Sequence, residues 1–112
     1  MSTSSGPTPI EITKSGADAH AALAGDFDMA ATFTVEPALE RLVDDPDLAR
    51  LTVDLSGLDF IDSTGIGVLL RLQTEAADRG IALELVPGPP EVQRVFETAG
   101  LRDSLPFTAR GD

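Results

Sequence analysis

The spacing of apolar and polar positions changes several times along the chain, most clearly between residues 51 and 79. Residues 51–55 are an apolar and β-branched run without a regular charged face, as in a central strand covered on at least one side. From residue 64 to residue 79 apolar residues recur at helical spacing, and Gly80 is suited to end that helix. Residues 59–65 carry two carboxylates and two hydroxyls between them. The pattern predicts a strand, a polar turn and a helix. Open α/β sheets commonly place their functional residues in such a turn, at the carboxyl end of a strand.

Shorter patterns predict the remaining elements. Residues 26–28 are expected to form a tight polar link before the first helix. That helix is expected to bury Phe33 and to hold Pro37 in its first turn, where proline is tolerated. The strands are expected over residues 10–13, 20–24, 51–55 and 81–86, with a weak one over 101–107, and the helices over 32–43, 64–79 and 91–99.

The alternation of strands and helices favours one α/β domain with crossover connections. A chain of 112 residues is long enough for one such domain. Residues 1–9 are too polar to bury a core, so we expect a disordered lead there. The domain is then expected over residues 10–108, followed by a short tail over 109–112.

The composition narrows the possible ligands. Nineteen acidic residues against eight basic ones give a net charge of −11, which disfavours binding to nucleic acid. Such a surface favours a partner with a basic face, although the charge is explained equally well by solubility. No apolar run reaches the roughly 18 residues of a membrane span, and no export signal is recognised at the amino terminus. We therefore expect a cytoplasmic monomer that binds neither nucleic acid nor membrane.

Ser63 is the candidate for chemistry in the polar turn. It follows Asp62 at the predicted start of a helix, where free backbone N–H groups and the helix dipole tolerate an anion. A phosphate on Ser63 would add about −1.5 to −2 charges, close to Asp59 and Asp62. Its effect would fall on a docked partner rather than on the fold. The structural alternative is that Asp62 or Ser63 simply caps the helix.

Enzymatic and metal-binding interpretations are weaker. A hydrolase elbow has glycine two residues before its serine, where this chain has Ile61, and nothing places His20 beside Ser63 as a base. Asp26 and Asp28 are better explained by turn formation than by a metal. The chain has no cysteine and one histidine, so the usual soft metal ligands are nearly absent. We expect no catalytic residue, no metal site and no cofactor.

Three motifs occur in the order of one known family. Residues 58–69 read LDFIDSTGIGVL, residues 25–28 read GDFD, and residues 90–101 read PEVQRVFETAGL. The first resembles the signature of STAS-domain anti-sigma factor antagonists. The second resembles the turn before that family's first long helix, and the third its penultimate helix. This resemblance covers about residues 10–107 and implies a single small STAS-type α/β domain, with a mixed β-sheet and helices packed against it.

The resemblance also implies a phosphorylation switch. Ser63 would be phosphorylated by a partner that is both an anti-sigma factor and a serine kinase, and a separate phosphatase would remove the phosphate. The unphosphorylated form would bind the kinase and free the sigma factor, with no catalysis by the antagonist itself. The partner-binding residues would be Asp28, Asp62, Ser63, Thr64 and Gly65.

An alternative function remains open. A STAS domain can instead be a regulatory or scaffold subunit of another complex, such as a lipid transporter or a stress-signalling assembly. The family usually has a further helix after its last strand, which we expect to be short or missing because the sequence ends at Asp112. Asp26 and Phe27 replace the family's glutamate and smaller apolar residue, and we expect little consequence.

Overall fold

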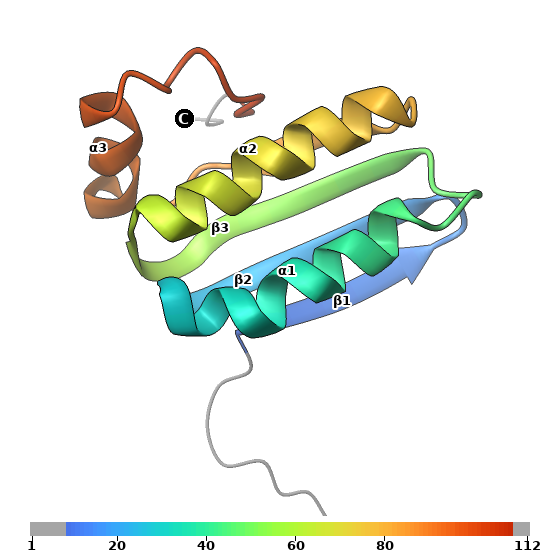
Figure 1. Cartoon of the computed structure of the whole chain (residues 1–112), viewed down its shortest axis with the longest axis horizontal. Helices are drawn as coiled ribbons and strands as arrows, with labels where there is room; N and C mark the ends of the chain where they lie inside the picture. The colour runs from blue at the N-terminus through green and yellow to red at the C-terminus, as the bar shows by residue number, and fades with distance from the viewer. Residues whose placement is uncertain (1–8, 109–112) are drawn as a thin grey trace, which may run out of the picture.

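The computed structural model describes residues 9–108, which form a four-stranded sheet and three helices (Figure 1). The lead predicted over residues 1–9, apart from Pro9, and the tail predicted over 109–112 lie outside the described residues. In chain order the elements are β1 (Ile10–Ser15), β2 (Asp18–Phe27), α1 (Met29–Val43), β3 (Arg50–Ile61), α2 (Ser63–Asp78), β4 (Ala82–Val86) and α3 (Pro90–Thr98).

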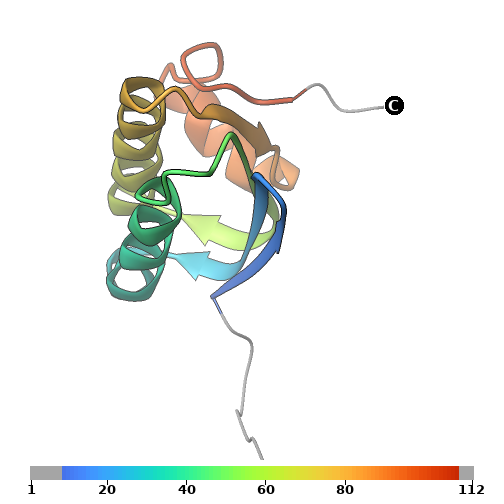
Figure 2. The ribbon, with the colours of Figure 1, turned by 90° about the vertical axis from the view of Figure 1, so that its right-hand side faces the viewer.

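The sheet is mixed and has the strand order β1-β2-β3-β4. β1 and β2 form an antiparallel hairpin, whereas β2, β3 and β4 run parallel to one another. The two parallel connections contain α1 and α2, which lie side by side against one face of the sheet (Figure 2). The predicted fold class, one α/β domain with a mixed sheet and helices packed against it, is confirmed.

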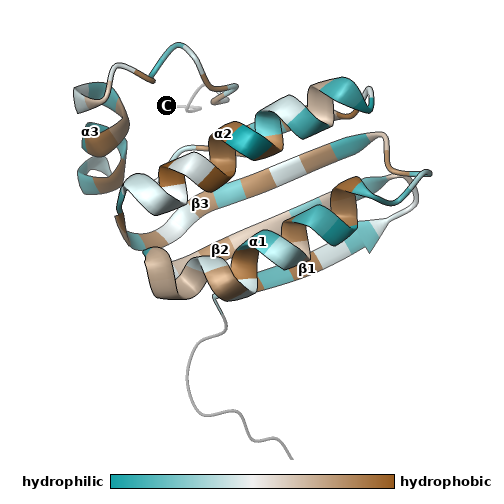
Figure 3. Cartoon of the chain, in the orientation of Figure 1, coloured by the Kyte–Doolittle hydropathy of each residue, from teal (hydrophilic) through white to brown (hydrophobic). Residues whose placement is uncertain are grey.

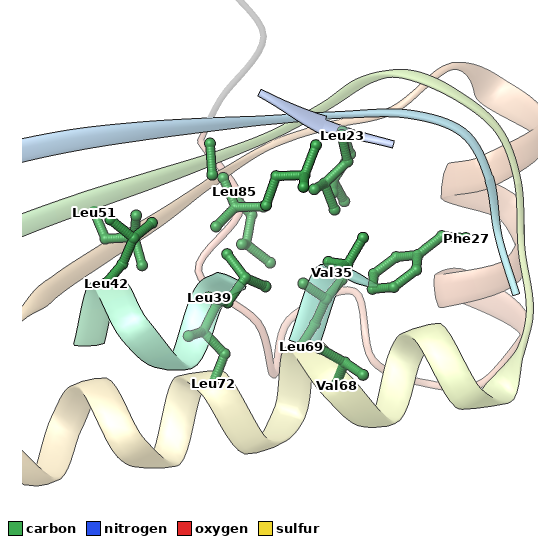
Figure 4. Packing of buried hydrophobic residues seen from close by; sticks show 14 of the residues in the cluster. Leu23, Phe27, Val35, Leu39, Leu42, Leu51, Val68, Leu69, Leu72 and Leu85 are labelled. Carbon is green, nitrogen blue, oxygen red and sulfur yellow. The ribbon is translucent and has the colours of Figure 1, made fainter. Parts of the chain in front are cut away.

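The hydrophobic core lies between the sheet and these two helices. Hydrophobic and hydrophilic residues alternate along much of β3 (Figure 3), so that Val53 and Leu55 share the buried face. Leu39 of α1 and Leu69 and Leu72 of α2 project towards the sheet and complete this layer (Figure 4). The core therefore holds the first turns of α1 and α2 against the ends of β2 and β3.

β2 and β3 are longer than predicted, and the polar turn is correspondingly shorter. β2 continues to Phe27 and β3 to Ile61, so the link predicted over 26–28 and the turn predicted over 59–65 are wrong in extent. Gly25 lies inside β2 with a φ of 80°, next to an irregularity in the pairing with β3. Because β2 has backbone partners on both sides, pairing outweighs the weak strand propensity of its alanines.

α1 begins earlier than predicted, and two of its residues differ from expectation. Its core-facing residues include Val35, Ala38 and Leu39. Phe33 lies about 200° around the helix from Val35 and is 77% exposed, so its predicted place in the core is wrong. Pro37 lies inside α1 rather than in its first turn, and because proline has no N–H the carbonyl of Phe33 loses its usual partner.

The segment after α3 is a set of turns rather than the predicted strand over residues 101–107. It meets the sheet through one isolated bridge between Leu85 and Phe107. The ring of Phe107 packs edge-to-face on Phe96 of α3, with 5.0 Å between the ring centroids. Pro106 lacks the N–H that a continuing strand would need, which explains why pairing does not extend.

Candidate functional site at the start of α2

Asp28 and Asp62 lie at the same end of the sheet although they are far apart in the sequence. Phe27 and Ile61 are register partners at the ends of the parallel strands β2 and β3. The backbone N–H of Asp62 donates a hydrogen bond to the carbonyl oxygen of Phe27, with an N–O distance of 3.3 Å. Asp28 and Asp62 therefore lie next to each other at the ends of β2 and β3, and each is followed directly by a helix.

Asp62 is the N-cap of α2. Its Oδ1 accepts hydrogen bonds from the backbone N–H groups of Thr64 (3.0 Å) and Gly65 (3.2 Å) and from the Thr64 hydroxyl (2.5 Å). These donors, the Thr64 hydroxyl foremost, lower the pKa of the Asp62 carboxyl below its usual range despite the opposing effect of partial burial. Asp62 is therefore ionised at neutral pH, and the predicted capping role is confirmed for Asp62.

Asp28 caps α1 in the same way. Its backbone is extended, and its side-chain Oδ1 accepts a hydrogen bond from the backbone N–H of Ala31 over 3.0 Å. The two carboxylates thus stabilise two neighbouring helix starts. The turn predicted for Asp26 and Asp28 is therefore wrong, because Asp26 lies exposed within β2 and Asp28 caps a helix.

Ser63 is the first residue of α2 and is exposed to solvent. Within residues 9–108 no hydrogen bond involves its hydroxyl, in contrast to the hydroxyl of Thr64. Ser63 and Ile66 form one side of a shallow pocket of about 420 Å³, and residues of α3 form the other side. The structure therefore presents the Ser63 hydroxyl at the rim of a groove between two helices.

Gly65 allows α2 to start close to the end of β2. A Cβ at this position would lie 2.6 Å from the carbonyl oxygen of Phe27 and 3.0 Å from its ring and from the Ile61 side chain. Gly67, two residues later, is different, because its Cβ would meet Arg71 Nη1 at 3.4 Å and nothing closer. Close packing against Phe27 and Ile61 thus requires glycine at position 65.

Exposed apolar side chains occur close to the site in sequence. Met29 is 60% exposed, Phe33 77% and Phe60 48%. Met29 and Phe33 are one turn apart at the start of α1, immediately after Asp28, and Phe60 precedes Asp62 by two residues. Phe33 was predicted to lie in the core, and Met29 was not predicted to be part of the site. Met29 and Phe33 are four residues apart and out of phase with Val35 and Leu39. This spacing in the sequence could have indicated a second apolar face of α1, away from the core.

His20 does not lie beside Ser63, and the described residues contain no cluster suited to a metal. His20 is paired with Thr52 in the sheet, about 30 Å along β3 from Ile61, and its Nε2 lies 3.7 Å from Asp54 Oδ2. Residues 9–108 contain no cluster of three or more histidine or acidic side chains placed to hold a metal. In the same range no helix has the length and apolar character needed to cross a membrane.

Comparison with known proteins identifies relatives. The family model described as Mlab, STAS domain, matches residues 10–106. A STAS-domain containing protein of Pseudomonas aeruginosa (strain UCBPP-PA14) is 32% identical over 72 residues, which are 64% of this chain and 69% of the relative.

Solved structures share the fold at lower identity. An anti-sigma factor antagonist from Mycobacterium paratuberculosis superposes with a TM-score of 0.78 at 22% identity, covering 92% of this chain and 86% of that one. The anti-sigma factor antagonist SpoIIAA in its unphosphorylated form gives 0.75 at 19%, covering 90% and 89%. The phosphorylated form of SpoIIAA, from Bacillus, gives 0.69 at 18%, covering 90% and 92%.

Proposed function

This chain belongs to the STAS domain family, and from that premise we propose that it is an anti-sigma factor antagonist controlled by phosphorylation of Ser63. The unphosphorylated protein binds an anti-sigma factor that is also a serine kinase, and the sigma factor is released. The kinase transfers the γ-phosphoryl group of ATP to the Ser63 oxygen, leaving ADP, and a phosphatase later hydrolyses the phosphoserine. The antagonist supplies the acceptor and the docking surface and catalyses neither step.

The observation that carries this proposal is the difference between two neighbouring hydroxyls. The Thr64 hydroxyl donates a hydrogen bond to Asp62, whereas the Ser63 hydroxyl is exposed and has no partner within residues 9–108. A kinase needs an accessible hydroxyl, so Ser63 is the acceptor and Thr64 supports the cap. SpoIIAA, which shares the fold, has been solved in both an unphosphorylated and a phosphorylated form.

Charge supplies the reason for release. The Asp62 carboxylate is already ionised next to Ser63 because its hydrogen bonds lower its pKa. Phosphorylation adds about −1.5 to −2 charges at pH 7, and it also adds bulk to the rim of the groove. A partner fitted to the neutral serine then loses both electrostatic and steric fit.

The proposed docking surface consists of Asp28, Asp62, Ser63, Thr64 and Gly65. The two carboxylates flank the acceptor from adjacent helix starts and would attract a partner with basic side chains, in keeping with the net charge of −11. Gly65 contributes by letting α2 approach β2. We further propose a cytoplasmic monomer, with its STAS domain over residues 10–108, that binds neither nucleic acid nor membrane.

A second candidate function is a regulatory or scaffold subunit of another complex, such as a lipid transporter. Two comparisons support keeping it: the matching family model is described as Mlab, STAS domain, and the name of the Pseudomonas relative, a STAS-domain containing protein, mentions no sigma factor. In that case the surface around Ser63 would bind its partner without a phosphorylation cycle.

Phosphorylation in cell extract separates these two functions. Wild-type protein is incubated with ATP and extract of the source cells, and the phosphorylated residue is located by peptide fragmentation. Ser63→Ala should abolish the modification, while Ser104→Ala, which removes an exposed serine in the segment after α3, should leave it unchanged. Phosphate that is absent, or that persists in Ser63→Ala, would contradict the proposal.

A further inference from the structure

The groove beside Ser63 contains one basic side chain. Ser63 and Ile66 of α2 line one side of a pocket of about 420 Å³, and the other side is lined by Glu91, Arg94, Val95 and Thr98 of α3 and by its C-cap Ala99. The exposed wall of this pocket is mostly apolar, and its charged members are Glu91 and Arg94. Arg94 is therefore the cation with which a group attached to Ser63 could pair.

The start of α2 is poorly able to neutralise such a group by itself. The N–H groups of Thr64 and Gly65 already donate to the Asp62 carboxylate, and the N–H of Ile66 donates to the Asp62 carbonyl. The helix end is thus occupied by an internal anion, contrary to the free N–H groups expected from the sequence. A phosphate on Ser63 would meet the negative charges of Asp62 and Glu91, with Asp28 at the neighbouring helix start.

Arg94 is available for this role. Three other basic side chains are engaged in ion pairs: Lys14 with Asp45, Arg71 with Glu36 and Arg79 with Asp44. Within residues 9–108 no ion pair involves Arg94, although Glu91 and Glu97 lie one turn to either side of it on α3. A guanidinium binds phosphate oxygens in a bidentate manner, which makes arginine well suited to this task.

We propose that Arg94 binds the phosphate of phosphorylated Ser63 within the same chain, drawing it across the groove between α2 and α3. This inference rests on the proposed function only in that Ser63 is the phosphorylated residue. The contact joins α2 to α3 and covers the apolar wall of the groove. The phosphorylated protein then differs from the unphosphorylated one in the shape of its surface as well as in its charge.

The test uses full-length protein with phosphoserine installed at position 63 during translation, so that no kinase is needed. The phosphate is titrated by ³¹P NMR in the wild-type background and in Arg94→Gln, Arg94→Lys and Arg102→Gln. Arg102 is a matched control, because it is exposed after α3 and lines a different pocket. Melting curves of the four unphosphorylated proteins establish that the variants are folded.

A bound guanidinium favours the dianion and so lowers the second pKa of the phosphate, which is about 6 in free phosphoserine. Arg94→Gln should raise this pKa by roughly 0.5 unit, about a threefold change in proton affinity. Arg94→Lys should fall between the two, and Arg102→Gln should match wild type. Equal pKa values in wild type and Arg94→Gln would overturn the inference. They would not contradict the proposal that Ser63 is phosphorylated. Conversely, a finding that Ser63 is not phosphorylated in cells would contradict the proposed function without changing the result of this titration.

Discussion

The backbone N–H of Asp62 donates to the carbonyl oxygen of Phe27, which joins the start of α2 to the end of β2. Through this bond the residue before Ser63 is fixed to the strand that ends next to Asp28. The adjacent ends of β2 and β3 thus hold the two acidic caps and the exposed serine in one arrangement.

Gly65→Ala should destabilise the protein by about 1–3 kcal/mol, because its Cβ would lie 2.6 Å from the Phe27 carbonyl oxygen. Gly67→Ala is the matched control. Its Cβ meets only the end of the Arg71 side chain, and alanine stabilises a helix interior by about 0.5–1 kcal/mol relative to glycine. Urea denaturation measures both, and equal effects of the two substitutions would contradict the close packing at Gly65.

Asp62→Ala should cost about 1 kcal/mol at neutral pH through loss of the N-cap. The folded-state pKa of Asp62 is lowered, so this carboxylate stabilises the fold above its unfolded pKa of about 3.9. The stabilisation is lost as the pH falls through the lower folded-state value. Urea denaturation of both proteins from pH 7 downward should therefore show the difference shrinking below about pH 4. A pH-independent difference would argue against the ionised cap.

Phe33→Ala should change the free energy of unfolding by less than about 0.5 kcal/mol, since the side chain is mostly exposed. Leu39→Ala, in the buried face of the same helix, should cost about 2–5 kcal/mol. Chemical denaturation of both variants measures this contrast. A large loss in Phe33→Ala would restore Phe33 to the core and contradict the register of α1.

Ser63→Glu should weaken binding to the anti-sigma kinase by at least tenfold, about 1.4 kcal/mol, because it places a negative charge beside Asp62. Ser63→Ala should bind like wild type, and Ser104→Glu controls for charge added elsewhere. Isothermal titration calorimetry measures the affinities of wild type and the three variants. Equal binding by Ser63→Glu and wild type would count against release by charge.

Local patterns predicted much of this fold, and tertiary context explains what they missed. The strand, cap and helix around Asp62 follow from spacing and capping chemistry, which act within a few residues. The full length of β2 depends on its pairing with β1 and β3. The local sequence does not predict this length, because alanine and glycine have weak strand propensity. The sequence predicts Pro37 in the first turn of a helix, whereas Pro37 lies within α1. The packing of the buried face of α1 offsets the missing backbone hydrogen bond.

The site was predicted in part for the same reason. Asp62, Ser63, Thr64 and Gly65 are contiguous, so their sequence pointed to one site. The register of Phe27 with Ile61 places Asp28 beside them, and the resemblance to STAS antagonists had already suggested this grouping. Arg94 of α3 and Ser63 of α2 line the same pocket, a neighbourhood that spacing within either helix could not reveal.

The central claim, that Ser63 is the phosphorylated residue of a switch, is tested most directly by mass spectrometry of the protein isolated from its own cells. Samples taken before and after stress give the intact mass, and fragmentation locates any phosphate. The account predicts one phosphoryl group on Ser63 whose occupancy changes with stress. Protein that carries no phosphate at Ser63 under any condition would contradict it and favour the scaffold function.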